Sequence, residues 1–169
     1  MVIWVTGLSG SGKSTLCSAL FEILKPTRPQ IVKLDGDEIR AVFGDNLGHS
    51  EADRIQQIGR IQRLAKLLTD QNLDVLVAAL YANPQLLAWN RANFADYFEI
   101  YIEASIEFLT PRNPKNLYGR GLRGEIKDVV GLDIPWQAPT RPDLLLQAAD
   151  APGAIDLANS VIRKISHLI

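Results

Sequence analysis

The chain has 169 residues and a formal charge of −1 at pH 7, with 47% hydrophobic and 22% charged residues. This length predicts a single domain over residues 1–169, and the near-zero charge excludes a global field that would recruit nucleic acid or an anionic membrane. The single cysteine excludes an internal disulfide, and no apolar run reaches the ~20 residues of a membrane span, so we expect a cytoplasmic protein.

The first elements are a buried strand and a phosphate-binding turn. Residues 2–6 are an apolar, β-branched run that predicts a strand, and helical spacing follows over residues 13–24. Between them, residues 7–14 read GLSGSGKS and match the P-loop pattern G-x-x-x-x-G-K-[ST]. In this motif the backbone N–H groups bind phosphate, so we expect Lys13 to contact the β- and γ-phosphates and the Ser14 hydroxyl to coordinate Mg²⁺. The predicted ATP-binding residues here are Gly7, Ser9, Gly10, Ser11, Gly12, Lys13, Ser14 and Thr15.

Two aspartates follow the second predicted strand, which covers residues 30–34. Because the carboxyl ends of parallel strands meet at one edge of a sheet, we expect Asp35 and Asp37 beside the P-loop. One carboxylate then holds Mg²⁺ and one accepts the proton of an attacking hydroxyl. The predicted catalytic residues are Lys13, Asp35 and Asp37, and the predicted metal ligands are Ser14 and Asp35. The alternative is a simple Asp-Gly turn in which Asp37 caps a helix.

The rest of the chain alternates helices with strands. An amphipathic helix is predicted over residues 51–71, with Ser50 as N-cap and with Ile55, Ile58 and Ile61 on its apolar face. Further strands are predicted over residues 73–80, 97–102 and 143–147, and further helices over residues 84–96 and 152–169. This order predicts an α/β P-loop kinase fold with five parallel strands flanked by helices. The glycine-rich, basic residues 112–139 predict a mobile lid, with a long surface loop as the alternative.

Two classes of P-loop protein are disfavoured by missing signatures. A guanine-binding N-K-x-D motif is absent from the sequence, and the third predicted strand ends in Tyr81 instead of an acidic residue. These features argue against a GTPase and against a motor or transport ATPase, so a kinase remains the favoured interpretation.

Four segments in chain order resemble the successive motifs of the adenylyl-sulfate kinase family. They are GLSGSGKST, LDGDEIR, LGHSEADR and RNPKNLYGRGLRGEIKDVVGLDIPWQAPTRPDLLL. The resemblance implies transfer of the γ-phosphate of ATP to the 3′-hydroxyl of adenylyl sulfate, with Mg²⁺, an ordered lid and a homodimer. It also implies that Arg40 and Arg54 hold the anionic end of the acceptor, that Arg112 lies near ATP, and that Lys115 lies near the transferred phosphate.

The acceptor site departs from the family pattern. His49 and Val129 replace two phenylalanines that resemble a clamp around adenine. Gln57 is the first residue of the segment that corresponds to the family's N-I-R-R motif, and this segment has one arginine fewer. Tyr81 replaces a serine. Stacking of a base on an aromatic ring contributes roughly 1–3 kcal/mol, so the loss of both rings favours a changed acceptor. The predicted acceptor-binding residues are Asp35, Arg40, His49, Arg54, Gln57, Tyr81, Lys115 and Val129.

Several functions stay open for this sequence. A pyrimidine nucleotide such as cytidine diphosphoramidate needs no adenine clamp, and adenylyl sulfate itself is the alternative acceptor. A kinase for a small molecule outside nucleotide metabolism and a catalytically silent nucleotide-binding module are further alternatives. In either nucleotide case the expected ligands are ATP and a small nucleotide acceptor, without nucleic acid or membrane.

Overall fold

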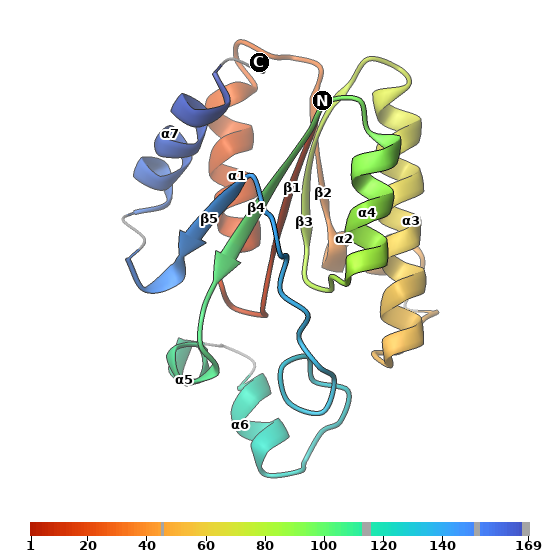
Figure 1. Ribbon diagram of the computed structural model, residues 1–169, viewed down its shortest axis with the longest axis vertical. Coiled ribbons are helices and arrows are strands. Elements are labelled where there is room, and N and C mark those ends of the chain that lie inside the picture. The colour runs from red at the N-terminus through yellow and green to blue at the C-terminus, as the bar shows by residue number, and fades with distance from the viewer. Residues whose placement is uncertain (45, 113–115, 151–152, 167–169) are drawn as a thin grey trace.

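The computed structural model describes residues 1–44, 46–112, 116–150 and 153–166, which form one parallel sheet with helices on both faces (Figure 1). The strands are β1 (Val2–Gly7), β2 (Ile31–Asp35), β3 (Asp74–Ala79), β4 (Tyr97–Glu103) and β5 (Leu144–Gln147). Their order is β2-β3-β1-β4-β5, and each neighbouring pair is parallel. The predicted fold of five parallel strands is therefore confirmed.

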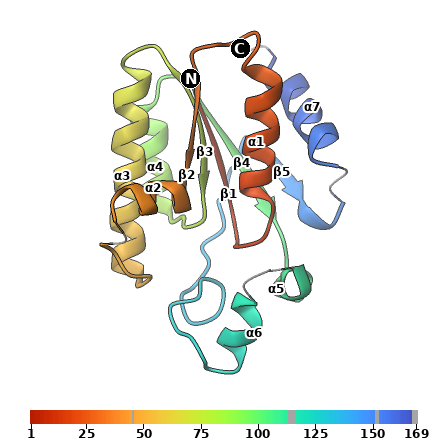
Figure 2. The ribbon, with the colours of Figure 1, turned by 180° about the vertical axis from the view of Figure 1, so that it is seen from behind.

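The helices form two layers around this sheet. They are α1 (Lys13–Leu24), α2 (Gly36–Val42), α3 (Glu51–Thr69), α4 (Pro84–Asn93), α5 (Ile106–Leu109), α6 (Leu117–Leu122) and α7 (Ala154–Ile165). Two 3₁₀ turns cover Thr110–Arg112 and Ala148–Asp150. Helices α1 and α7 cover one face and α3 and α4 cover the other, while α5 and α6 lie beyond the carboxyl ends of the strands (Figures 1 and 2). Within the described ranges, none of these helices combines the length and apolarity needed to cross a bilayer.

The central strands are buried on both faces because helices cover each side of the sheet. All six residues of β1 and all six of β3 are buried. Alternate side chains of β1 enter opposite cores: Ile3 and Val5 pack in the cluster that includes α1 and α7, and Val2 and Trp4 pack in the cluster that includes α3. This explains why the strands read as continuous apolar runs in the sequence.

Some expectations for the helices are corrected by the structure. Ser50 caps α3 as expected, since its hydroxyl accepts a hydrogen bond from the Asp53 N–H at 3.3 Å. Ile58 and Ile61 are buried, but Ile55 is 41% exposed and does not belong to the apolar face. The sequence does not predict α2, α5 or α6, because these helices are too short to show an apolar period.

The predicted lid is not a surface loop along its whole length. Tyr118, Val129, Val130 and Ile134 have at most 6% of their surface exposed and belong to the same core cluster as Trp4. The return part of the segment is therefore packed on the α3 side of the sheet. The long-surface-loop alternative is wrong for these residues, because their apolar side chains are sequestered from water.

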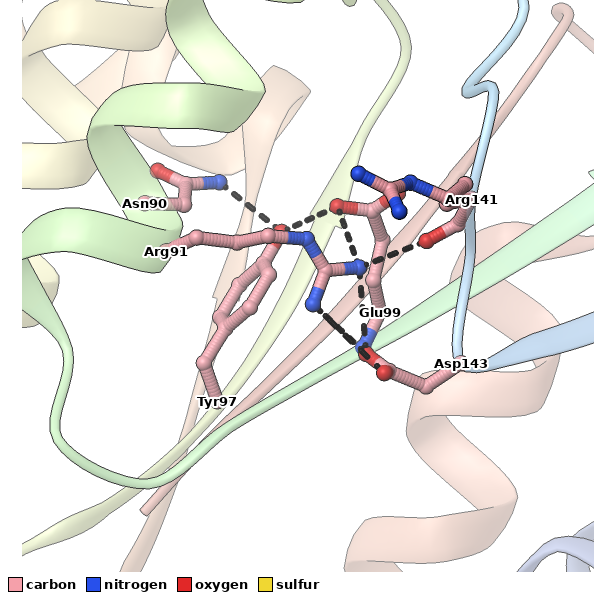
Figure 3. A network of polar contacts seen from close by, with 6 residues as sticks. All are labelled: Asn90, Arg91, Tyr97, Glu99, Arg141 and Asp143. Atoms are coloured by element: carbon pink, nitrogen blue, oxygen red, sulfur yellow. Dashed lines mark hydrogen bonds and ion pairs between the residues drawn. The ribbon is translucent and has the colours of Figure 1, made fainter.

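A polar network fixes the chain where it returns from the lid to the sheet (Figure 3). The Arg91 guanidinium in α4 donates to the carbonyl of Arg141 at 2.8 Å and lies 3.3 Å from a carboxylate oxygen of Asp143. It also lies 3.6 Å from the carboxylate of Glu99 in β4, which is 1% exposed and accepts a hydrogen bond from the Tyr97 hydroxyl at 2.9 Å. Asp143 in turn accepts from the Glu99 N–H at 2.7 Å. The network joins α4, β4 and the start of β5.

We predict that Glu99→Gln changes the pH dependence of stability. Burial raises the pKa of Glu99, so the folded protein binds this proton more tightly than the unfolded chain does. The free energy of unfolding of the wild type should therefore fall relative to Glu99→Gln as pH rises above the ordinary glutamate value of about 4.5. Urea denaturation at a series of pH values measures this difference. The exposed Glu38→Gln serves as control, and a pH-independent difference for Glu99→Gln would contradict the prediction.

Candidate active site

A cavity of about 200 Å³ lies at the carboxyl ends of β1, β2 and β3. The P-loop, the turn from β2 into α2, the first turns of α3 and the end of β3 line it. It brings together most of the predicted site residues: Ser9, Gly10, Lys13, Ser14, Asp35, Asp37, Arg40, His49, Arg54, Gln57 and Tyr81. These residues meet because parallel strands end at one edge of the sheet, where ligands bind in α/β folds.

A second cavity of about 250 Å³ lies on the other side of the P-loop. Ser11, Gly12, Thr15 and Arg112 are among its lining residues, and Gly10 lines both cavities. The Arg112 guanidinium lies 4.0 Å from the centroid of the Phe108 ring, so it packs against the lining of this cavity. The P-loop is thus a wall shared by two adjacent ligand spaces.

Three glycines of the P-loop turn have positive φ, and two of them, Gly7 and Gly12, need glycine for different reasons. Gly7 has φ +153°, and a Cβ there would lie 2.5 Å from the backbone carbonyl oxygen of Ile102. Gly12 has φ +99° and is the N-cap of α1. In contrast to Gly7, a Cβ on Gly12 would meet no atom within 4 Å. Gly7 is therefore required for space, whereas Gly12 is required for backbone conformation alone.

Lys13 carries a buried ammonium at the start of α1. Its side chain donates to the carbonyl of Leu8 at 2.7 Å, and the residue is 9% exposed. Burial lowers the pKa of Lys13 to about 8, although the nearby charges of Asp35 and Asp37 act in the opposite direction. An anion bound at the turn would favour the charged form of Lys13, so binding and charge at this position are coupled.

Asp35 connects the P-loop to α2. As N-cap of α2 it accepts a hydrogen bond from the Asp37 N–H at 2.9 Å, and its other carboxylate oxygen accepts from the Ser14 hydroxyl at 2.5 Å. The expected proximity of Asp35 to the P-loop is therefore confirmed. The Asp-Gly turn of the alternative interpretation does begin a helix, but Asp35 caps it and Asp37 lies in its first turn. A hydroxyl and a carboxylate within one hydrogen bond of each other are the hard oxygen donors that suit Mg²⁺.

The other end of the cavity is electropositive. Arg40 donates to the carbonyls of Leu47 and Gly48 at 2.8 and 2.9 Å, and Arg54 donates to the carbonyl of His49 at 2.9 Å. Burial and then the nearby Arg40 lower the pKa of Arg54. Burial and then both arginines lower the pKa of His49, which leaves the imidazole neutral at pH 7. Two mutually repelling guanidinium groups are favourably placed for an anionic ligand.

Gln57 and Tyr81 form the inner wall of the cavity. The Gln57 side chain is 4% exposed and donates to the carbonyl of Gly36 at 3.2 Å, while its Oε1 has no hydrogen-bond partner among the described residues. The Tyr81 hydroxyl donates to Glu51 at 2.5 Å, and the tyrosine is 2% exposed. Burial raises the pKa of Tyr81 to about 12, so it is a neutral, fixed wall residue at physiological pH.

Not every predicted site residue lines these cavities. Val129 is 1% exposed and packs in the core, although the adjacent Asp128 carbonyl accepts from Arg54 at 2.7 Å. A direct contact between Val129 and an acceptor stays a prediction. Lys115 lies outside the described residues.

Two residues near the site were not predicted as site residues, although both lie in segments that resemble family motifs. Glu51 is tied to the Tyr81 hydroxyl, and Tyr118 of α6 donates to the carbonyl of Ser9 at 3.1 Å. Each pair joins segments far apart in the chain, and neither Glu51 nor Tyr118 belongs to a spacing that predicts chemistry. Their roles follow from the tertiary contacts alone.

The family model and the relatives found by sequence comparison point to the same protein family. The family model described as Adenylylsulphate kinase matches residues 1–147. The probable adenylyl-sulfate kinase of Bacillus subtilis is 38% identical, over 98% of this chain and 84% of that protein. The cytidine diphosphoramidate kinase of Campylobacter jejuni is 34% identical, over 98% and 96% of the two chains.

Solved structures and longer relatives agree with this family. The Mycobacterium tuberculosis APS kinase CysC, solved in complex with AMPPNP and APS, has a TM-score of 0.87 and 34% identity, with 98% of this chain and 96% of that chain covered. The bifunctional enzyme NodQ of Rhizobium is 36% identical over 88% of this chain. The chain spans only 24% of the length of NodQ.

We predict that Gly7→Ala destabilises the protein more than Gly12→Ala. Both changes strain a backbone with positive φ, at about 1–2 kcal/mol each. Gly7→Ala also forces a Cβ against the Ile102 carbonyl within the sheet, so its loss should total about 2–4 kcal/mol. Urea denaturation of the two variants measures the free energies of unfolding. Equal losses would show that the space around Gly7 has been misjudged.

Proposed function

The chain belongs to the adenylylsulphate kinase family of ATP-dependent nucleotide kinases, and we propose that it phosphorylates a ribose 3′-hydroxyl of a small nucleotide acceptor. The proposal rests on the arrangement of charged residues in the first cavity. A single cavity has the P-loop, Lys13 and Asp35 at one end and the electropositive pair Arg40 and Arg54 at the other. This arrangement suits a triphosphate at the first end and an anionic nucleotide at the second.

At the donor end, the P-loop and Lys13 hold the phosphates of ATP. The amides at the start of α1 and the Lys13 ammonium face the charge that spreads over the transferring phosphoryl group. The base of ATP then lies in the second cavity, where Thr15 and Arg112 are among the lining residues. Lys115 of the lid completes the set of cations that we assign to the transferred phosphate.

Between the two ends, Asp35 orients the accepting hydroxyl and takes its proton, with Asp37 as its partner. Ser14 and Asp35 are also the residues that would hold Mg²⁺, because their oxygens adjoin each other at the edge of the P-loop. Bound Mg²⁺ would neutralise charge on the β- and γ-phosphates. Among the described residues, no group of three or more acidic, histidine or cysteine side chains is placed to hold a metal ion. Phosphates and water would supply the other ligands of Mg²⁺.

At the acceptor end, Arg40 and Arg54 hold the anionic group of the acceptor, and His49, Gln57 and Tyr81 surround the rest of it. His49 offers one aromatic face where the family pattern has phenylalanine, and Val129 offers none. A pyrimidine acceptor of the cytidine diphosphoramidate type fits this reduced stacking better than adenylyl sulfate does. The similarity to a cytidine diphosphoramidate kinase supports this choice, and the similarity to adenylyl-sulfate kinases keeps adenylyl sulfate as the second candidate.

Two further properties complete the proposal. The lid formed by residues 112–139 excludes water during transfer, which limits wasteful hydrolysis of ATP. The active form is a homodimer in the cytoplasm. The family resemblance supports the dimer, and the free, buried thiol of Cys17 is in keeping with a reducing compartment.

We predict that Asp35→Asn lowers kcat by at least ~10²-fold, the scale of a lost general base. The KM for ATP should change little, because Lys13, the backbone amides and the Ser14 hydroxyl remain to hold the phosphates and Mg²⁺. Steady-state ADP release measures both constants. Glu38→Gln, in the helix that Asp35 caps, is the control, since that side chain is 62% exposed and pairs only with Lys33 among the described residues. A kcat near that of the wild type would exclude Asp35 as the base.

We predict that the wild type has a higher kcat/KM with cytidine diphosphoramidate than with adenylyl sulfate. His49→Phe restores one aromatic face and should raise kcat/KM for adenylyl sulfate at least ~5-fold, the lower end of base stacking. His49→Leu is the matched control because it fills similar space without a ring. A coupled ADP-release screen measures all three proteins, and efficient use of adenylyl sulfate by the wild type would refute the pyrimidine assignment.

A further inference from the structure

Tyr118 reaches the phosphate-binding turn from the lid. It belongs to the six-residue helix α6, beyond the carboxyl ends of the strands, and yet it is fully buried, whereas Leu122 of the same helix is 66% exposed (Figure 1). Its hydroxyl donates to the backbone carbonyl of Ser9 at 3.1 Å. Burial raises the pKa of Tyr118 to about 12, so the hydroxyl keeps its proton and stays a donor. The side chain therefore makes a fixed polar contact with the P-loop.

This contact acts on one peptide unit. The peptide between Ser9 and Gly10 is trans, so its C=O and N–H groups point in opposite directions. When the Ser9 carbonyl faces Tyr118, the N–H of Gly10 faces away from Tyr118. Ser9 and Gly10 both line the first cavity. Gly10 has φ +81° and no side chain, so its own conformation offers little resistance to rotation of this peptide. The hydrogen bond from Tyr118 therefore restricts the orientation of this peptide.

We propose that the Tyr118 hydroxyl is a positioning group of the lid, which locks the Ser9–Gly10 peptide with its N–H directed at the phosphates of ATP. The neighbouring carbonyl is held in a similar way: that of Leu8 accepts from the Ser11 N–H at 3.2 Å and from Lys13 at 2.7 Å. Two successive carbonyls of the turn are thus occupied by protein donors. The Gly10 N–H, on the peptide whose carbonyl Tyr118 holds, is the group that the proposal directs at the anion.

Apolar packing holds the lid segment against the P-loop. The Leu8 side chain is 5% exposed and belongs to the same core cluster as Tyr118 and the lid residue Val130. A Cβ on Gly131 of the lid would lie 3.3 Å from Leu8, which shows how closely the two segments pack. The docked lid therefore completes the donor site from outside the P-loop. The inference rests on the proposed function only in placing ATP at this turn, and it is independent of the acceptor.

Tyr118→Phe tests the lock, because phenylalanine keeps the buried ring and removes only the hydroxyl. Loss of one neutral hydrogen bond should weaken binding of a non-hydrolysable ATP analogue about threefold to tenfold and raise the KM for ATP equally. The KM for the acceptor should stay within twofold of the wild type. Calorimetry without acceptor and steady-state kinetics give these values, and urea denaturation gives the accompanying loss of stability.

Tyr97→Phe is the matched control. It also removes a buried hydroxyl, one that bonds Asn90 and Glu99 in the network of Figure 3, and it should leave nucleotide binding unchanged. Nucleotide affinity within twofold of the wild type for Tyr118→Phe would overturn the lock, as would an equal loss in Tyr97→Phe. A third outcome separates the two proposals. If no acceptor is phosphorylated but Tyr118→Phe alone weakens nucleotide binding, the positioning role of Tyr118 is supported and the proposed acceptor is wrong.

Discussion

The buried ammonium of Lys13 is the interaction on which the architecture of this site depends. A lysine that is 9% exposed loses most of its hydration, and burial lowers its pKa to about 8. The Leu8 carbonyl and the nearby Asp35 offset part of that cost, and an anion at the helix start would offset more. The turn must therefore be held in one conformation, and the crowding at Gly7 and the donor from Tyr118 both restrict it.

Charge separation along one cavity gives the site its direction. Asp35 adjoins the P-loop through Ser14, whereas Arg40 and Arg54 lie where α2 and α3 face the cavity and the lid turn. Under the proposed function, a substrate with an anionic end and a free hydroxyl would bind in one orientation, with the hydroxyl toward the donor phosphate. The donor half keeps the residues of the family pattern, and changes such as His49 gather in the acceptor half. Specificity can thus diverge without loss of the transfer chemistry.

The sequence alone was sufficient for the fold and for the expectation that most of the predicted site residues lie close together. Apolar runs predicted every strand of the sheet to within one residue at each end. The runs of β1 and β3 are continuous because these strands are buried on both faces and have no polar side. The P-loop and Asp35 were predicted to adjoin each other because strand ends meet in parallel sheets, and they do. The short α2 escaped prediction because seven residues show too little of a helical period.

What the sequence determined by itself is the local chemistry: a turn that binds phosphate, acids at a strand end, and the order of the elements. Only the tertiary structure decided which distant side chains meet. Tyr118 joins Ser9 across 109 positions, and Tyr81 joins Glu51 across 30. It also decided that Val129 enters the core instead of lining the cavity. Local patterns encode backbone conformation, whereas such contacts arise when packing of the whole chain excludes water and leaves each buried polar group to find its partner.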